Sequence, residues 1–246
     1  MSVDDAFFDR VAHDLRGELS TMVAGVHYLL RYGDSLTPAA REMLGRVSGA
    51  GERLARLLEE LDDAVWLLET PKDLHPMPVQ LGALLDDVVA RVGKVAASRG
   101  ARLVVELPED TGELMGDPDV LAAALAYVVD LAALRSRDQA VYISAEVKDG
   151  APVIRVVDEA GPVPEEMLAR IFEPFVEREL LPKEQAGRRK LRLGIGMTIA
   201  RAMLEAHGGS LVVEMSPGGG GLVAQCKLGA LSAAAAEPPE KARASG

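Results

Sequence analysis

The chain begins with a long amphipathic pattern that is typical of a helix. Between residues 4 and 32, apolar side chains recur at three- and four-residue steps, and this spacing predicts one apolar face along a helix. The positions of that face are Val11, Leu15, Leu19, Met22 and Val26. His13 lies off the centre of the face and is followed by Asp14. An acid beside an imidazole can make one ring nitrogen a better nucleophile, although the same pair is also ordinary on a solvated helix surface.

A second helix is predicted from about residue 37 to residue 70. Gly33 to Ser35 indicate a turn, Thr37 is suited to cap a helix, and Pro38 is suited to its first position. Two long helices joined by a short turn predict an antiparallel hairpin over residues 1–70. One hairpin buries its apolar face poorly, so we expect a four-helix bundle formed by a dimer. A bundle that serves only for oligomerisation would fit the same positions.

Residues 71–78 are rich in proline and predict a linker. The following residues, 79–229, predict an α+β domain in which helices lie on one face of a mixed sheet. The expected helices are 79–99, 117–135, 164–171 and 193–207, and the expected strands are 101–107, 140–147, 152–157, 211–214 and 222–228. Residues 230–246 are rich in Ala, Pro and Glu and predict a disordered tail.

The composition narrows the class of protein. Of the 246 residues, 48% are hydrophobic but only 4% are aromatic, so a large core must consist mainly of Leu, Val and Ala. The formal net charge of −11 argues against nucleic acid or an anionic membrane as a partner. The single cysteine fits a reducing compartment. Because no apolar run approaches about eighteen residues and the first residues are not those of a signal peptide, we expect a soluble, cytoplasmic protein.

Four short segments occur in an order and spacing that resemble bacterial two-component sensor histidine kinases. His13-Asp14-Leu15-Arg16 resembles the phosphoacceptor box of that family, and Asp158 resembles its adenine-binding aspartate. Phe172-Glu173-Pro174-Phe175 resembles the F-box. Gly194-Ile195-Gly196-Met197, followed by a helix ending at Gly208-Gly209, is similar to the second glycine box. No single segment is specific, but the four together point to this family.

The resemblance implies a dimeric helical hairpin joined to a Bergerat-type ATP-binding domain. It implies that ATP phosphorylates His13, with Asp14 as the orienting group or base, and that the phosphoryl group then passes to an aspartate of a response-regulator receiver domain. The expected partners are a second copy of the chain, the response regulator and a separate sensor protein. The expected cofactors are ATP and Mg²⁺.

The same resemblance assigns the residues that would hold ATP. Asp158 would accept a hydrogen bond from the adenine amino group, and the N–H groups of Gly194 and Gly196 would face the phosphates at the start of a helix. The other implied residues are Gly161, Phe172, Phe175 and the basic run Arg188, Arg189 and Lys190 in the lid segment 177–193. Asp158 could instead form a turn, and the basic run could be a solvated loop.

The chain departs from the family at the metal site. Tyr127 and Leu131 stand where two asparagines are usual, and Leu134 stands where a lysine is usual. Because Mg²⁺ requires oxygen ligands, we expect Asp130 to substitute, with Glu159 and Asp138 as alternatives. Arg135 and Arg137 would take over the role of the lysine at the phosphates, or would be solvated charges at a helix end.

Two other functions fit these departures. One is an ATP-independent phosphotransfer adapter that relays phosphate through His13, and the other is a pseudokinase scaffold that binds a response regulator. The missing asparagines, and Ala160 and Pro162 where the family usually has glycine, favour these alternatives. Asp158, Gly194, Gly196 and the basic run favour an active kinase, and the sequence therefore predicts a soluble histidine kinase.

Overall fold

The structure is a computed structural model that describes residues 3–33, 35–68, 74–108, 112–148, 150–180 and 193–229. The side chains of residues 3–14 and of residue 178 lie outside this description. The chain divides into two compact units. One comprises Met1–Lys72 with Phe172–Ile199, and the other comprises Asp73–Ile171 with Ala200–Gly246.

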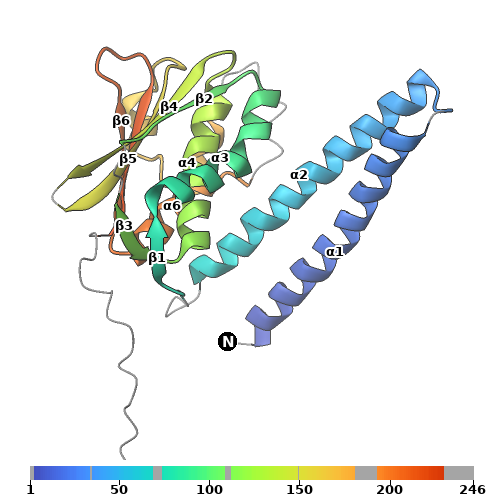
Figure 1. Ribbon diagram of the computed structural model, residues 1–246, viewed down its shortest axis with the longest axis horizontal. Helices are drawn as coiled ribbons and strands as arrows, with labels where there is room; N and C mark the ends of the chain where they lie inside the picture. Colours follow the sequence, from blue (N-terminus) through green and yellow to red (C-terminus); the bar gives the residue numbers. More distant parts are fainter. Residues whose placement is uncertain are drawn as a thin grey trace, which may run out of the picture. The chain divides into compact units, whose positions relative to one another are not determined.

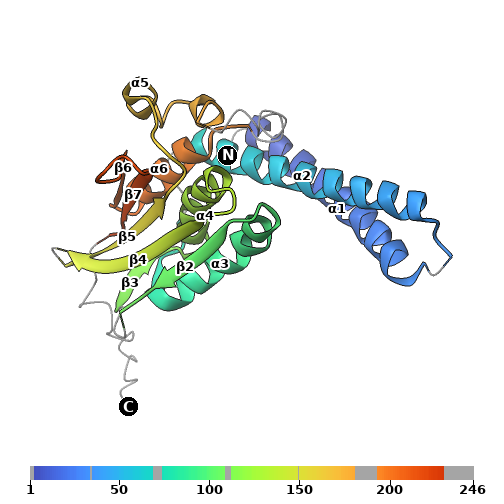
Figure 2. The ribbon, with the colours of Figure 1, turned by 90° about the horizontal axis from the view of Figure 1, so that it is seen from above.

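Two long helices form the predicted hairpin. Helices α1 (Val3–Tyr32) and α2 (Pro38–Leu68) lie side by side, as Figure 2 shows. Thr37 accepts a hydrogen bond from the Ala40 N–H at 3.2 Å, which confirms the predicted cap of α2. Arg41 donates to the Leu30 carbonyl oxygen at 2.9 Å and so ties the start of α2 to the end of α1.

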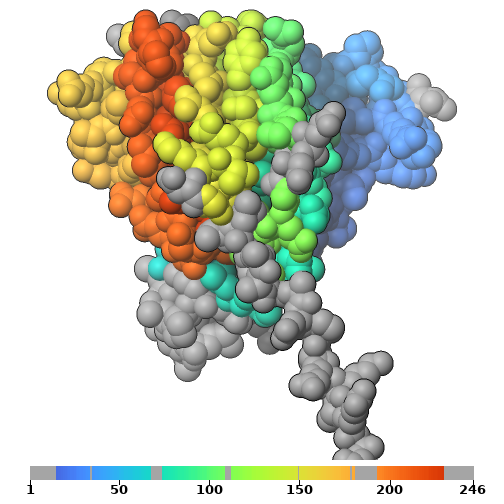
Figure 3. Space-filling model, turned by 60° about the vertical axis from the view of Figure 1, so that its left-hand side comes forward, coloured from blue at the N-terminus to red at the C-terminus, as the bar shows by residue number. Residues whose placement is uncertain are grey.

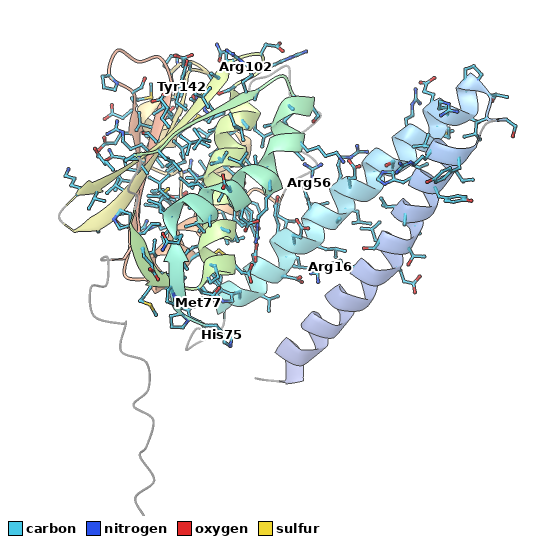
Figure 4. All side chains as sticks on the ribbon, in the orientation of Figure 1. Arg16, Arg56, His75, Met77, Arg102 and Tyr142 are labelled. Carbon is cyan, nitrogen blue, oxygen red and sulfur yellow. The ribbon has the colours of Figure 1, made fainter. Side chains whose placement is uncertain are left out.

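Small and polar residues set the contact between the two helices. A Cβ atom on Gly51 would lie 2.4 Å from Cγ2 of Val23, so only glycine allows this close approach. His27 Nε2 lies 2.8 Å from the hydroxyl oxygen of Ser48, which is buried. Arg16, labelled in Figure 4, pairs with Asp62 near the other end of the hairpin. These contacts fix the antiparallel register of α1 and α2.

The apolar face of the hairpin is wider than one partner helix can cover. Leu19 of α1 and Leu58 of α2 are buried between the helices. Other apolar side chains at seven-residue spacing are at least 40% exposed. They are Leu15, Met22 and Leu29 on α1, and Val47, Leu54 and Leu61 on α2. The predicted stripe of α1 is therefore divided between a face against α2 and an uncovered face.

The second unit is an α+β arrangement with a mixed sheet, as the sequence predicts. The five-stranded sheet has the order β2-β4-β5-β7-β6, in which β2 and β4 are parallel and the other pairs are antiparallel. Its strands are β2 (Arg102–Glu106), β4 (Ala140–Lys148), β5 (Ala151–Asp158), β6 (Ser210–Met215) and β7 (Leu222–Lys227). A separate antiparallel pair consists of β1 (Met77–Gln80) and β3 (Glu113–Gly116).

Helices cover one face of this sheet. Figure 1 shows α3 (Leu81–Ser98) and α4 (Pro118–Arg135) on that face, together with α6 (Gly196–Ala206). The described buried hydrophobic residues include no Phe, Tyr or Trp, which confirms the prediction of an aliphatic core. Cys226 on β7 is fully buried, and burial raises the pKa of its thiol to about 12. The neutral thiol therefore behaves as a small apolar side chain.

No helix among the described residues covers the opposite face of the sheet (Figure 1). Its strands form the neighbouring orange, yellow-green and green bands of Figure 3. Tyr142 on β4 and Val212 on β6 are 40% and 45% exposed. No helix in the described part of the chain is both long and apolar enough to cross a lipid bilayer.

The structure differs from the predicted elements in two places. The strands β1 and β3 were not expected, and β1 begins at Met77, inside the predicted linker 71–78. Each has four residues, too few for a clear alternating pattern, and β1 contains Pro78. The predicted helix 164–171 contains only one helical turn, α5 (Glu165–Leu168).

Asp117 joins three segments of the second unit. Its carboxylate accepts hydrogen bonds from the N–H groups of Asp119 at 3.1 Å and His75 at 2.9 Å, and it caps α4. Its own N–H donates to His207 Nε2 at 3.1 Å, just beyond the end of α6. Burial opposes ionisation of the carboxyl group, but the N–H donors of His75, Val120 and Asp119 outweigh it. The pKa of Asp117 is therefore lowered from its ordinary value.

Replacing Asp117 by Asn keeps an oxygen that can cap α4 but removes the charge. A carboxyl group whose pKa is lower in the folded state stabilises the fold above its unfolded pKa of about 4, and this stabilisation is lost as the pH falls through the folded pKa. We expect the difference in free energy of unfolding between wild type and Asp117→Asn, measured in urea, to be largest near neutral pH and to shrink below about pH 4. The control Asp86→Asn, at an exposed position of α3, should follow the wild type throughout. A difference in free energy of unfolding that does not change with pH would contradict the lowered pKa of Asp117.

Candidate functional site

Asp158, the predicted adenine-binding residue, lies at the end of strand β5 and is almost fully buried. Its carboxylate forms an ion pair with Arg135, at the end of α4, which is equally buried. Arg135 Nε donates to Asp158 Oδ2 at 2.9 Å, and Nη2 donates to Oδ1 at 3.4 Å. The same Nη2 donates to the carbonyl oxygen of Gly161 at 2.9 Å. The structure therefore brings together three of the predicted site residues.

Two backbone groups complete the surroundings of this carboxylate. The N–H groups of Ala160 and Leu222 donate to Asp158 Oδ1 at 3.1 Å and 3.3 Å. A Cβ atom on Gly221 would lie 1.9 Å from the Asp158 carbonyl oxygen, so glycine is required where β7 begins. Gly221 was not singled out by sequence reasoning. The run of four glycines before β7 was the available signal for such a close approach.

Arg135 is placed differently from its expected role at the phosphates. An ionised carboxylate has about four acceptor sites, and the donors from Arg135, Ala160 and Leu222 already make four contacts with Asp158. In this arrangement the guanidinium group of Arg135 neutralises a buried charge. Its contacts do not resemble those of a solvated charge at a helix end, which was the other expectation.

A second group of predicted residues lies within the unit that contains Phe172–Ile199. The N–H of Phe175 donates to the carbonyl oxygen of Gly194 at 2.6 Å, and Thr198 Oγ1 donates to the carbonyl oxygen of Phe172 at 2.9 Å. Phe175 has a φ angle of 74°, in the left-handed region, and its side chain is exposed. Such a conformation costs a non-glycine residue roughly 1–2 kcal/mol. The F-box and the glycine box are therefore held against each other.

Glu177 and Glu60 also belong to this unit, and sequence reasoning did not identify either of them. The carboxylate oxygens of Glu177 accept hydrogen bonds from the N–H groups of Gly196 at 3.3 Å and Met197 at 3.1 Å. The carboxylate of Glu60, on α2, accepts from the N–H of Leu193 at 2.7 Å. Both glutamates are buried, at 4% exposure. Neither forms a sequence pattern with its partner, because the partner lies far along the chain.

The arrangement around Asp130 does not fit the predicted metal ligand. Its carboxylate oxygen lies 2.5 Å from Arg99 Nη1 in a largely buried ion pair. Leu131 and Leu134, on the same helix, are buried and provide no oxygen. Within the described ranges, no three His, Cys, Asp or Glu residues lie close enough together to hold a metal ion. A cation at Asp130 would have to displace Arg99.

The side chains of five predicted residues lie outside the described part of the structure. His13 and Asp14 lie within α1, but their side chains are outside the described part of the structure. Arg188, Arg189 and Lys190 lie outside the described residues altogether.

Comparison with known proteins identifies the region that contains Asp158. Residues 116–229 match the family described as histidine kinase-, DNA gyrase B-, and HSP90-like ATPase. The chain is similar in structure to full-length ShkA, which was crystallised in complex with AMPPNP. The superposition has a TM-score of 0.70 and 21% sequence identity, and it covers 94% of this chain and 47% of ShkA. This similarity shows that the fold is shared.

Two curated relatives extend the match beyond the ATPase region. The sensor protein DivL of Caulobacter vibrioides is 29% identical over 215 residues, which is 87% of this chain and 26% of DivL. The probable sensor histidine kinase TcrY of Mycobacterium tuberculosis is 28% identical over 217 residues, which is 86% of this chain and 43% of TcrY. The chain thus spans less than half the length of either relative. It is similar to two-component sensor histidine kinases, and its residues 116–229 match the histidine kinase-, DNA gyrase B-, and HSP90-like ATPase family.

Proposed function

We propose that the chain is a histidine kinase that uses ATP to phosphorylate its own His13 and then transfers the phosphoryl group to an aspartate of a response regulator. The observation that carries the proposal is the extent of the match to sensor kinases. It covers 215 residues with DivL, far more than the ATPase segment, and so includes much of the helical part that contains His13. The comparisons do not favour the ATP-independent alternatives.

Each group of residues has a defined task under this proposal. Asp158 accepts a hydrogen bond from the adenine amino group, and Gly161 leaves space beside it, because a Cβ atom there would meet no other atom within 4 Å. The N–H groups at the start of α6, at Gly194 and Gly196, hold the phosphates, which the helix dipole also favours. Phe172 and Phe175 hold the segment before the lid, and the basic run Arg188, Arg189 and Lys190 approaches the phosphates. ATP supplies the phosphoryl group, and Asp14 orients His13 or accepts its proton.

The Arg135–Asp158 pair constrains this proposal. Three of the four donors contact Oδ1 and one contacts Oδ2, so the adenine amino group can bind only at the remaining lone pair of Oδ2 or by displacing a donor. The contact from Arg135 Nη2 is the longest of the four, at 3.4 Å, and is the one that yields most easily. The same pair is an observation that would support the adapter or the pseudokinase, because Arg135 and two backbone N–H groups take up most acceptor sites of the adenine-binding residue.

The exposed apolar residues of the hairpin support a homodimer. By the register of the contacts His27–Ser48 and Arg16–Asp62, the exposed residues of α1 lie level with those of α2. The level pairs are Leu15 with Leu61, Met22 with Leu54, and Leu29 with Val47. A second hairpin placed on this surface would complete a four-helix bundle with a closed apolar core. The response regulator and a separate sensor protein remain the other proposed partners.

Autophosphorylation can be tested directly with γ-labelled ATP and Mg²⁺. We expect the wild-type protein to acquire an acid-labile, base-stable label and His13→Ala to remain unlabelled. The control His75→Ala, which changes a largely exposed histidine outside the hairpin, should be labelled like the wild type. If no label appears, the kinase proposal is wrong. A phosphorylated receiver domain should then be offered, and transfer to His13 would identify the adapter.

The dimer can be tested with a charge on the exposed apolar face. Met22 is 65% exposed in a single chain, so Met22→Glu should leave the hairpin folded but place an unpaired carboxylate in a dimer core. We expect light scattering after size exclusion to show a dimer for the wild type and at least a tenfold weaker dimer for Met22→Glu. The matched control Ser20→Glu lies about 200° around the helix and should remain dimeric. A monomeric wild type, or equal behaviour of both variants, would exclude this interface.

The buried ion pair predicts a large loss of stability on truncation. Arg135→Ala leaves the Asp158 carboxylate buried and uncompensated, and the free energy of unfolding should fall by roughly 3–5 kcal/mol. Arg137→Ala, two residues further on and with a side chain that is 66% exposed, should change it by less than about 0.5 kcal/mol. Urea denaturation measures both. Similar values for the two variants would show that the Asp158 carboxylate does not depend on Arg135.

A further inference from the structure

The start of helix α6 is occupied by an acidic side chain from elsewhere in the chain. The first N–H groups of a helix have no partner within the helix and attract anions, including phosphates. In α6 these groups belong to Gly196 and Met197, and each donates to a different oxygen of the Glu177 carboxylate. Two N–H groups therefore bind the two oxygens of one carboxylate, as they would bind two oxygens of a phosphate.

The origin of this carboxylate distinguishes it from an ordinary helix cap. An ordinary cap is the residue that immediately precedes the helix and has a short polar side chain. The residues before α6 are Leu193, Gly194 and Ile195, which have no side-chain oxygen. Glu177 lies 19 residues before Gly196 and belongs to the one-turn helix η1 (Val176–Arg178) that follows the F-box. The contact therefore exists only while η1 lies against the start of α6.

The segment that carries Glu177 is held in a conformation that costs free energy. Phe175, which immediately precedes η1, has its left-handed φ angle of 74° and donates its N–H to Gly194 at 2.6 Å. Glu177 as a whole residue is 4% exposed, so its carboxylate is largely removed from water while it binds the N–H groups. A ligand that takes these N–H groups would release both the strained backbone and the buried charge.

We propose that Glu177 is an internal substitute for a nucleotide phosphate and inhibits binding of the triphosphate until it leaves the start of α6. This inference rests on the proposed function, in which the glycine box receives the phosphates of ATP. The carboxylate and the phosphate require the same N–H groups, and their like charges exclude simultaneous binding. Glu177 therefore lowers the affinity for ATP without altering recognition of adenine. Departure of Glu177 also couples phosphate binding to movement of η1 and the F-box.

The test compares Glu177→Gln with wild type and with the matched control Glu179→Gln, which changes an exposed glutamate two residues away. Gln keeps the shape of the side chain and an oxygen that can accept one hydrogen bond, but it removes the charge. Calorimetry with ATP, adenosine and inorganic tripolyphosphate measures the affinities. We expect Glu177→Gln to bind ATP and tripolyphosphate about tenfold more tightly than the control, and to bind adenosine equally well.

The three ligands separate this inference from the proposed function. If adenosine and ATP bind to no form but tripolyphosphate binds more tightly to Glu177→Gln, the proposed adenine site fails and the role of Glu177 stands. If Glu177→Gln binds ATP and tripolyphosphate no more tightly than Glu179→Gln, the inference is overturned. If Glu177→Gln does not fold, the inference can be tested on the wild type by following its amide NMR resonances during a titration. Tripolyphosphate should shift those of Gly196 and Met197, and unchanged resonances at saturation would also overturn it.

Discussion

The buried pair of Arg135 and Asp158 is the interaction on which the second unit of the structure depends. One partner ends a helix and the other ends a central strand, so the pair fixes helix α4 along the sheet. The same two side chains also engage the loop at Gly161 and the start of β7 at Leu222. Removing two charges from water is costly, and this arrangement offsets the cost because the carboxylate accepts four hydrogen bonds and the guanidinium group also donates to the Gly161 carbonyl oxygen.

The groups that would bind the nucleotide already form hydrogen bonds with side chains of the same chain. The side chain is basic in one unit and acidic in the other. A guanidinium group lies on the carboxylate assigned to adenine, and a carboxylate lies on the N–H groups assigned to phosphate. Nucleotide binding under the proposed function is therefore an exchange of hydrogen bonds. Its net free energy is the difference between the new contacts and those given up, and this difference is smaller than either.

The long elements of the fold were predictable because their signals are local. The three- and four-residue apolar spacing predicts α1 and α2, and the Asp117-Pro118 cap predicts the start of α4. The strands β4, β5, β6 and β7 were expected from alternation and turn residues. The paired strands β1 and β3 were not, since four residues with a proline carry little pattern. Residue spacing also gave no indication that one apolar stripe would be divided between two faces of the hairpin.

The sequence predicts which residues belong to the candidate site, but it does not predict their contacts. Asp158 and the glycines could be identified by their order along the chain. The partner of Asp158 could not, because Arg135 lies 23 residues away and meets it only through the packing of α4 on the sheet. The same holds for Glu177, whose partners lie across the lid segment. A basic residue near a predicted phosphate site suggests that this residue binds phosphate. Only the fold shows that Arg135 instead pairs with the carboxylate of Asp158.

The buried thiol of Cys226 on β7 can report how often the sheet opens locally. Cys226 is the only cysteine of the chain and lies on a strand paired on both sides, opposite Ile154 and Leu211. Its sulfur can meet a reagent only when β7 separates from its neighbours or from the helices above it. The rate of thiol modification therefore measures how often the sheet opens, at a strand whose first residue donates to the Asp158 carboxylate. Any ligand that tightens that end of the sheet would slow the reaction without touching the sulfur.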